Sequence, residues 1–161
     1  MYLKELLSVH QQAFKQKVVE AFAEKHSMTI EQVLKSQGVV IDNYVHSKYQ
    51  GVERAVSEIT EFKRPVILNI RRDPCGEAVC MICERDQPNI EKLQLIYDDR
   101  IVFYELYDST PEAALYHIIH QCEGEKLLPL TAVIHNGAVK KYWSGRPVEV
   151  DEYREYLDLL V

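Results

Sequence analysis

The sequence predicts an α/β domain preceded by two helices. Short apolar runs with the length of buried strands alternate with longer segments in which apolar residues recur every three or four positions. The pair Asn136-Gly137, flanked by two further apolar segments, is the strongest β-hairpin signal in the chain. With 161 residues, of which 47% are hydrophobic, the chain is long enough for one domain with a substantial core. We therefore expect the element order β-α-β-α-β-α-β-β-α, with a helical pair in front.

The overall charge argues against two classes of partner. The formal net charge is -6 at pH 7, whereas non-specific binding to nucleic acid or to an anionic membrane needs clustered positive charge. No apolar run is long enough to span a membrane. The first residues, MYLKELLSVHQQAFKQK, lack the apolar stretch of a signal peptide. We therefore expect a cytoplasmic protein that binds neither nucleic acid nor membrane.

The segment 1–38 predicts a helical N-terminal extension. Apolar residues at intervals of three and four run from Leu3 to Phe22, which is typical of an amphipathic helix. The sequence Thr-Ile-Glu-Gln at 29–32 matches a capping box, and Gly38 is suited to end a helix. A second, short helix is therefore expected at about 30–37. We expect the pair to pack on the domain or on a protein partner.

The domain at 39–161 is predicted to contain several strands joined by amphipathic helices. Apolar runs predict strands at 39–41, 66–70, 101–106, 130–134 and 139–143. Helical spacing predicts one helix that ends before Pro65, a second after Cys80 with a kink at Pro88, a third that starts at Thr110-Pro111, and a last one at about 150–160.

Three of the four cysteines lie within nine residues, between the strand at 66–70 and the helix that follows it. Cys80 and Cys83 are separated by two residues at the start of that helix, where a disulfide can close with little backbone movement. The free N–H groups and the partial positive charge of a helix N-terminus favour a thiolate on the first cysteine. Cys80 would attack a substrate disulfide, and Cys83 would resolve the mixed disulfide. A CxxC pair between a buried strand and a helix favours this redox function.

Several spacings recur together with this cysteine pair in one known family. They are the five-residue step from Cys83 to Pro88, the eight-residue steps from Pro129 to Gly137 and from Gly137 to Gly145, and the strand with its acidic turn at 100–108. With these features, residues 39–161 resemble thioredoxin. The resemblance implies a thioredoxin-like fold, with a central mixed sheet of four to five strands flanked by helices. It also implies that the Leu128–Pro129 bond is cis and faces the CxxC pair, and that the backbone there binds an extended substrate segment.

The active-site segment departs from the thioredoxin pattern. Val79 stands where the family has tryptophan, and Met81-Ile82 replaces the Gly-Pro between its cysteines. The buried strand carboxylate that assists proton transfer in the family aligns with Asn69, and an amide cannot take up a proton. Turnover is then slow, or a nearby carboxylate substitutes. Asp73, Glu77 and Glu84 are nearby carboxylates that could assist proton transfer instead.

The cysteines leave other functions open. Cys75, Cys80 and Cys83, with the distant Cys122, reproduce a plant-type ferredoxin spacing, and the same four, with His120, could hold zinc. A further alternative is a non-catalytic thioredoxin-fold module that binds a protein through its N-terminal helices or its cysteine loop. If the protein is an oxidoreductase, its partners are protein or small-molecule disulfides and thiols, and it needs no cofactor. Cys75 is then an extra thiol that could pair with Cys80 or Cys83.

Overall fold

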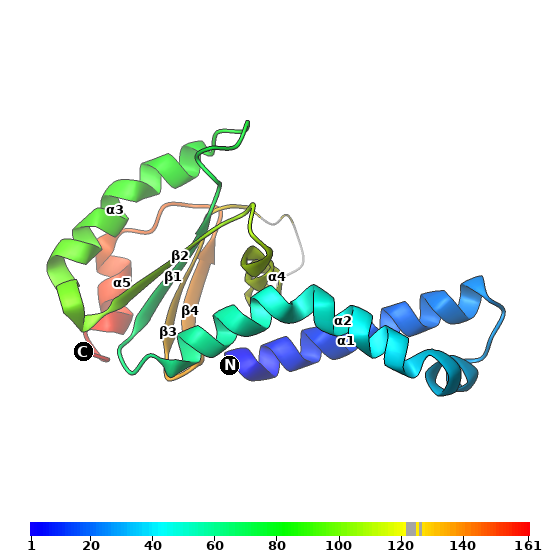
Figure 1. The fold of residues 1–161 in the computed structure, drawn as a ribbon. Helices are drawn as coiled ribbons and strands as arrows, with labels where there is room; N and C mark the ends of the chain where they lie inside the picture. Colours follow the sequence, from blue (N-terminus) through cyan, green and yellow to red (C-terminus); the bar gives the residue numbers. More distant parts are fainter. Residues whose placement is uncertain (122–124, 126) are drawn as a thin grey trace.

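A four-stranded mixed sheet forms the centre of the protein in this computed structural model, which describes residues 1–121, 125 and 127–161. The strands are β1 (Val66–Arg71), β2 (Val102–Tyr107), β3 (Leu130–His135) and β4 (Ala138–Ser144), in the spatial order β2-β1-β3-β4 (Figure 1). β1 pairs with β2 in parallel and with β3 antiparallel, and β3 pairs with β4 antiparallel. This order confirms the expected thioredoxin-like α/β fold.

The β3–β4 hairpin forms where the Asn-Gly pair predicts it. Asn136 and Gly137 have φ angles of 51° and 74°, and two-residue hairpin loops commonly need positive φ at both positions. Glycine also fits the crowding at this turn, because a Cβ on Gly137 would lie 3.1 Å from the Thr60 side chain. The turn thus fixes the register in which β4 returns along β3.

Helices cover both faces of the sheet. On one face, α3 (Met81–Tyr97) and α5 (Val150–Leu157) pack on side chains that include Ile67 and Val133. On the other face, the remaining helices share a larger core with alternate residues of β1, such as Leu68. They are α1 (Leu3–Lys25), α2 (Ile30–Glu61) and α4 (Leu115–Ile119), and two 3-10 turns occur at Asp98–Arg100 and Pro111–Ala114. Successive strand residues point to opposite faces, so Asn69 lies on the same face as Ile67, toward α3.

The strand predicted at 39–41 is wrong, because this segment lies inside α2, a single helix of 32 residues. The capping box at Thr29 is present, but Gly38 does not end the helix. A buried stripe that includes Ile41, Val45 and Val52 continues at helical spacing through the segment, so packing against α1 and the sheet outweighs the β preference of the valines. The boundary expected between residues 38 and 39 therefore falls within α2.

The start of the chain is attached to the sheet at the β3–β4 hairpin. The Leu3 amide donates to the Gly137 carbonyl oxygen and the Val139 amide donates to the Met1 carbonyl oxygen, each at 2.8 Å. Leu3 is completely buried in the core that α1 and α2 share with the sheet. Farther along, α1 and α2 extend away from the sheet as a helical arm (Figure 1). Within the described part of the chain, no helix combines the length and the apolarity needed to cross a membrane.

Candidate functional site

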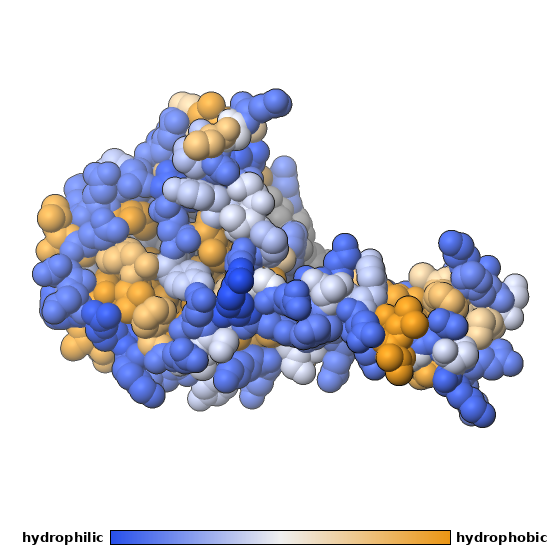
Figure 2. Space-filling view, viewed as in Figure 1, coloured by the Kyte–Doolittle hydropathy of each residue, from blue (hydrophilic) through white to orange (hydrophobic). Residues whose placement is uncertain are grey.

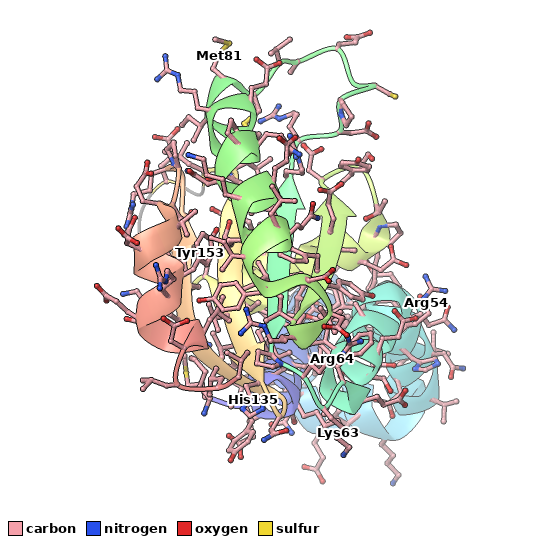
Figure 3. The ribbon with its side chains drawn as sticks, turned by 90° about the vertical axis from the view of Figure 1, so that its left-hand side faces the viewer. Arg54, Lys63, Arg64, Met81, His135 and Tyr153 are labelled. Carbon is pink, nitrogen blue, oxygen red and sulfur yellow. A yellow bond between two sulfur atoms is a disulfide. The ribbon has the colours of Figure 1, made fainter. Side chains whose placement is uncertain are left out.

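The disulfide between Cys80 and Cys83 lies at the N-terminus of α3, just beyond the end of β1. The two Cα atoms are 5.3 Å apart. Cys80 is the N-cap residue of the helix, and its Sγ accepts a hydrogen bond of 3.2 Å from the Cys83 amide. Met81 marks this end of α3 in Figure 3. Cys80 is partly exposed and Cys83 is buried, so Cys80 is the more accessible sulfur of the pair.

The segment at 127–129 faces this disulfide. The Leu128–Pro129 peptide bond is cis, as expected, and the Leu128 carbonyl oxygen lies 4.0 Å from the Cys80 Sγ. The Gly145 amide donates to the Pro129 carbonyl oxygen at 3.0 Å, which ties this segment to the end of β4. The cysteine pair at 80–83 and Pro129 therefore come together from two distant places in the sequence.

Two hydroxyl groups hold the backbone before Pro129. The Tyr116 and Ser144 hydroxyls both donate to the Leu127 carbonyl oxygen at 2.8 Å, and the two hydroxyl oxygens lie 2.7 Å from each other. Tyr116 comes from α4 and Ser144 from the end of β4. Helices and strands on both sides thus position the segment that faces the disulfide.

The loop between β1 and α3 is ordered by Asp73. Its carboxylate accepts hydrogen bonds from the Ser109 hydroxyl at 2.6 Å and from the Cys75 amide at 2.8 Å, and these bonds lower the pKa of Asp73. Its amide donates to the Asp108 carboxylate at 2.8 Å. Asp73 is therefore a loop-stabilising anion and is poorly suited to take up a proton. Cys75 is a free, exposed thiol in this loop.

Asn69 is buried on the α3 side of the sheet. Its Nδ2 donates to the Thr131 Oγ1 at 2.9 Å, and the two residues are direct partners in the β1–β3 register. The position at which the resemblance implies a carboxylate thus holds an amide in a cross-strand hydrogen bond.

Asp86 is a buried carboxyl group that the sequence reasoning missed. It is 2% exposed, it lies one turn after Cys83 on α3, and it accepts a 2.8 Å hydrogen bond from the Val148 amide. Burial raises the pKa of Asp86, and this effect outweighs the hydrogen bonds from Val148 and Asn89 and the attraction of Arg71. The signal that could have revealed it is its place on the inward stripe of α3, between Cys83 and Ile90. By contrast, Glu77 and Glu84 are exposed.

Arg71 brings positive charge to the disulfide. It lines a small cavity of about 90 Å³ together with Arg72, Cys80 and Cys83. Its guanidinium also donates to the Gln87 side chain on α3. A cation beside a cysteine favours the thiolate, and here the two arginines act against the carboxylates of Asp73 and Glu84, which line the same cavity.

Apolar side chains surround the partly exposed Cys80. Val79, Met81 and Leu127 are all exposed, and Figure 2 shows hydrophobic surface at this end of the molecule. Beside Leu128 lies a groove of about 410 Å³. Ile70, Ala113, Tyr116 and Asp108 are among its lining residues. An extended peptide segment laid across Pro129 would meet this surface.

The cysteines do not form a metal centre among the residues that the structure describes. No group of three or more His, Cys, Asp or Glu side chains in that part of the chain is placed to hold a metal ion. Cys122, the fourth ligand in the zinc and iron–sulfur alternatives, lies outside the described residues. The ring of His120 stacks on Tyr116, with ring centroids 5.4 Å apart.

Comparisons with known proteins show structural similarity without a sequence match. The sequence matches no protein-family model and no curated protein. The chain is similar to a solved structure described as thioredoxin-2, a component of the malaria parasite protein secretion machinery, with 18% sequence identity and a TM-score of 0.45. The match covers 60% of this chain and 80% of that one. The fold itself is established by the strand order and connections described above.

Proposed function

We propose that the protein is a thiol–disulfide oxidoreductase, with Cys80 as the nucleophile and Cys83 as the resolving thiol. The observation that carries this proposal is the placement of the cysteine pair: it caps α3 and faces the cis Leu128–Pro129 bond, with the Leu128 oxygen 4.0 Å from the Cys80 Sγ. Exchange needs an accessible sulfur and a second sulfur within bonding reach, and both are present.

The surroundings of Cys80 support its role as nucleophile. In the dithiol form, the Cys83 amide and the other free N–H groups of the first turn stabilise a thiolate on Cys80. Arg71 adds a positive charge at the shared cavity. The side chain of Cys83 is buried beneath this first turn, which keeps external disulfides away from it. Substrate therefore reacts at Cys80 first.

The reaction proceeds through two exchanges. The Cys80 thiolate attacks one sulfur of the substrate disulfide, so that a Cys80–substrate bond forms and the other substrate sulfur leaves as a thiol after protonation. The Cys83 sulfur then attacks Cys80, which forms the Cys80–Cys83 bond and releases the second substrate thiol. Two electrons pass from the dithiol to the substrate, and a cellular thiol must reduce the pair for the next cycle. We expect such a cycle in the reducing cytoplasm.

The substrates that fit best are disulfides in protein segments. Exposed apolar side chains around Cys80 and the groove beside Leu128 provide contacts that a small, strongly polar disulfide would not use. The backbone next to Pro129 is the part that, by the resemblance to thioredoxin, is expected to bind the main chain of an extended segment. Small-molecule disulfides and thiols are expected to react more slowly through the same Cys80 sulfur.

The test is reduction of insulin disulfides by the protein in the presence of dithiothreitol. Wild type should accelerate the reaction, Cys80→Ser should abolish the acceleration, and Cys83→Ser should accumulate a mixed disulfide that mass spectrometry detects. Cys75→Ser is the matched control, because it removes an exposed, unpaired thiol from the adjacent loop, and it should retain activity. Equal background rates for wild type and Cys80→Ser would refute catalysis.

A second candidate function is a protein-binding module without redox turnover. The arm formed by α1 and α2 exposes apolar side chains, because Val39 and Val40 on α2 are 75% and 62% exposed. Figure 2 shows hydrophobic surface on this arm. Such adjacent apolar residues are suited to bind a protein partner. This candidate is favoured if the insulin assay gives only background rates while Val40→Asp abolishes binding to a partner isolated with the wild-type protein.

A further inference from the structure

Asp86 and Cys83 share one buried face of α3. Both side chains are almost completely inaccessible, at 2% and 4% exposure, and they lie three residues apart in a continuous helix. Residues with this spacing have Cβ atoms about 5–6 Å apart on the same side of a helix. The stripe continues with Ile90 and Leu93, which pack on the sheet. The carboxyl group and the resolving sulfur therefore face the same interior space, between α3 and the sheet.

Few interactions offset the cost of burying the Asp86 carboxyl group. Its hydrogen bonds come from the Val148 amide and the Asn89 side chain, and no ion pair within 4 Å includes it among the described residues. The titratable and charged groups that act on it from the elements packed around it are Arg71 of β1, Arg146 and Glu149 between β4 and α5, and Tyr153 of α5. Burial raises the pKa of Asp86 despite the two arginines. A carboxyl group whose pKa is raised in this way takes up and releases its proton at a higher pH than an exposed one.

Cys83 needs a proton acceptor because it must become a thiolate before it attacks. Bulk water has little access to its buried side chain. Asn69, on the same face of the sheet, cannot take up a proton, and Asp73 is held as an anion by the Ser109 hydroxyl and the Cys75 amide. Glu84 is adjacent to Cys83 in sequence, but it is exposed to solvent. Asp86 is the carboxyl group that is both buried and on the side of α3 that carries Cys83.

We propose that Asp86 is the proton acceptor for Cys83 in the resolving step. This proposal rests on the proposed exchange reaction. The Asp86 carboxylate takes the proton of the Cys83 thiol, directly or through one water molecule. The Cys83 sulfur then attacks the Cys80 sulfur, the bond between Cys80 and the substrate breaks, and its electron pair leaves on the substrate sulfur. That sulfur then takes a proton, and the carboxylate is restored when Asp86 gives up its own. The dithiol thus loses two electrons and two protons in total.

The first test is the pH dependence of the resolving step in Asp86→Asn. The amide oxygen of asparagine can still accept the Val148 hydrogen bond, so the variant removes the proton acceptor while it keeps this contact. We expect release of substrate thiol from the mixed disulfide to slow on the order of 10²-fold near pH 7. The loss should shrink toward pH 9, where hydroxide can deprotonate Cys83. Glu84→Gln, which removes an exposed carboxylate next to Cys83, is the control and should follow the wild-type profile.

The second test uses the wild-type protein and does not depend on the stability of a variant. The ¹³C chemical shift of the Asp86 carboxyl carbon is followed against pH in the disulfide and dithiol forms. The dithiol form should show a second inflection at the pH at which Cys83 ionises, and the disulfide form should not. Identical titration curves in the two forms, or a wild-type pH profile for Asp86→Asn, would overturn the proposal even if insulin reduction itself depends on Cys80.

Discussion

Replacing Gly145 with alanine should displace the segment that faces the disulfide. Gly145 has a φ of +72°, which side-chain-bearing residues rarely adopt, and its amide donates to the Pro129 carbonyl oxygen at 3.0 Å. A Cβ at this position would lie 2.6 Å from the Leu127 Cβ. Because the contact is with the Cβ and not with the flexible end of the side chain, the backbone around Leu127 must move to relieve it.

The magnitude follows from these two effects. The left-handed conformation costs about 1–2 kcal/mol for a residue other than glycine, and the clash adds to this cost. The movement also changes the position of Leu128, whose oxygen faces the Cys80 sulfur. A misplacement of about 1 Å at a reacting centre can lower a rate on the order of 10²-fold. We therefore expect the free energy of unfolding to fall by at least about 1–2 kcal/mol. The rate of insulin reduction should fall on the order of 10²-fold.

The assay pairs urea unfolding with insulin reduction, and the same substitution at Gly38 is the control. Gly38 lies inside α2, and a Cβ added there would meet no atom within 4 Å. Gly38→Ala should therefore raise the free energy of unfolding by roughly 0.5–1 kcal/mol, because alanine favours the helix, and it should leave activity unchanged. Wild-type stability and activity in Gly145→Ala would refute the reasoning about the Leu127–Pro129 segment.

Three further predictions concern the core, the Pro129 segment and the buried carboxyl group. Leu3→Ala should lower the free energy of unfolding by about 2–5 kcal/mol in urea titrations, because Leu3 is completely buried; a loss below 1 kcal/mol would show that α1 contributes little to the common core. Tyr116→Phe should cost about 1 kcal/mol by removing a hydrogen bond to the Leu127 oxygen, and insulin reduction should fall; an unchanged rate would argue that this bond does not position the segment. Because the pKa of Asp86 is raised on folding, its stabilising contribution is present below pH 3.8 and is lost as the pH rises through the raised value. Urea unfolding of the disulfide form between pH 4 and 8 should therefore show a decline that Asp86→Asn lacks, and parallel curves would contradict it.

The strands were predictable because their signals are local. The strand predicted at 66–70 extends to Arg71, and the Asn136-Gly137 turn placed the last two strands correctly. The strand prediction at 39–41 is wrong because valine and isoleucine, taken without their long-range contacts, favour strands. The helical conformation of this segment depends on a buried stripe that spans most of α2 and packs on α1. Such long-range packing is not visible in a window of a few residues.

In the candidate site, too, local signals predict one part and long-range packing decides the other. The spacing of Cys80 and Cys83 and the resemblance at Pro129 were enough to predict that these residues meet. The spacing could not rank the nearby carboxylates, because burial decides their chemistry. Val148, 62 residues later in the chain, bonds to Asp86, and α5 packs on the same side of the sheet as α3. A carboxylate on an apolar helical stripe is a local signal, and it becomes informative when read together with the missing carboxylate at Asn69.

The arm and the disulfide occupy opposite ends of the sheet. β3 begins beside Pro129 at the disulfide and ends at the hairpin to which the start of α1 is bonded. A six-residue strand has a length of about 17–20 Å, so the arm lies far from the Cys80–Cys83 disulfide. The two ends are nevertheless joined by one core, since Leu3, Leu68 and Leu130 belong to the same cluster. Under the proposed function, a partner bound on the arm would leave Cys80 accessible, and we expect a change at Leu3 to affect turnover only through the stability of the whole domain.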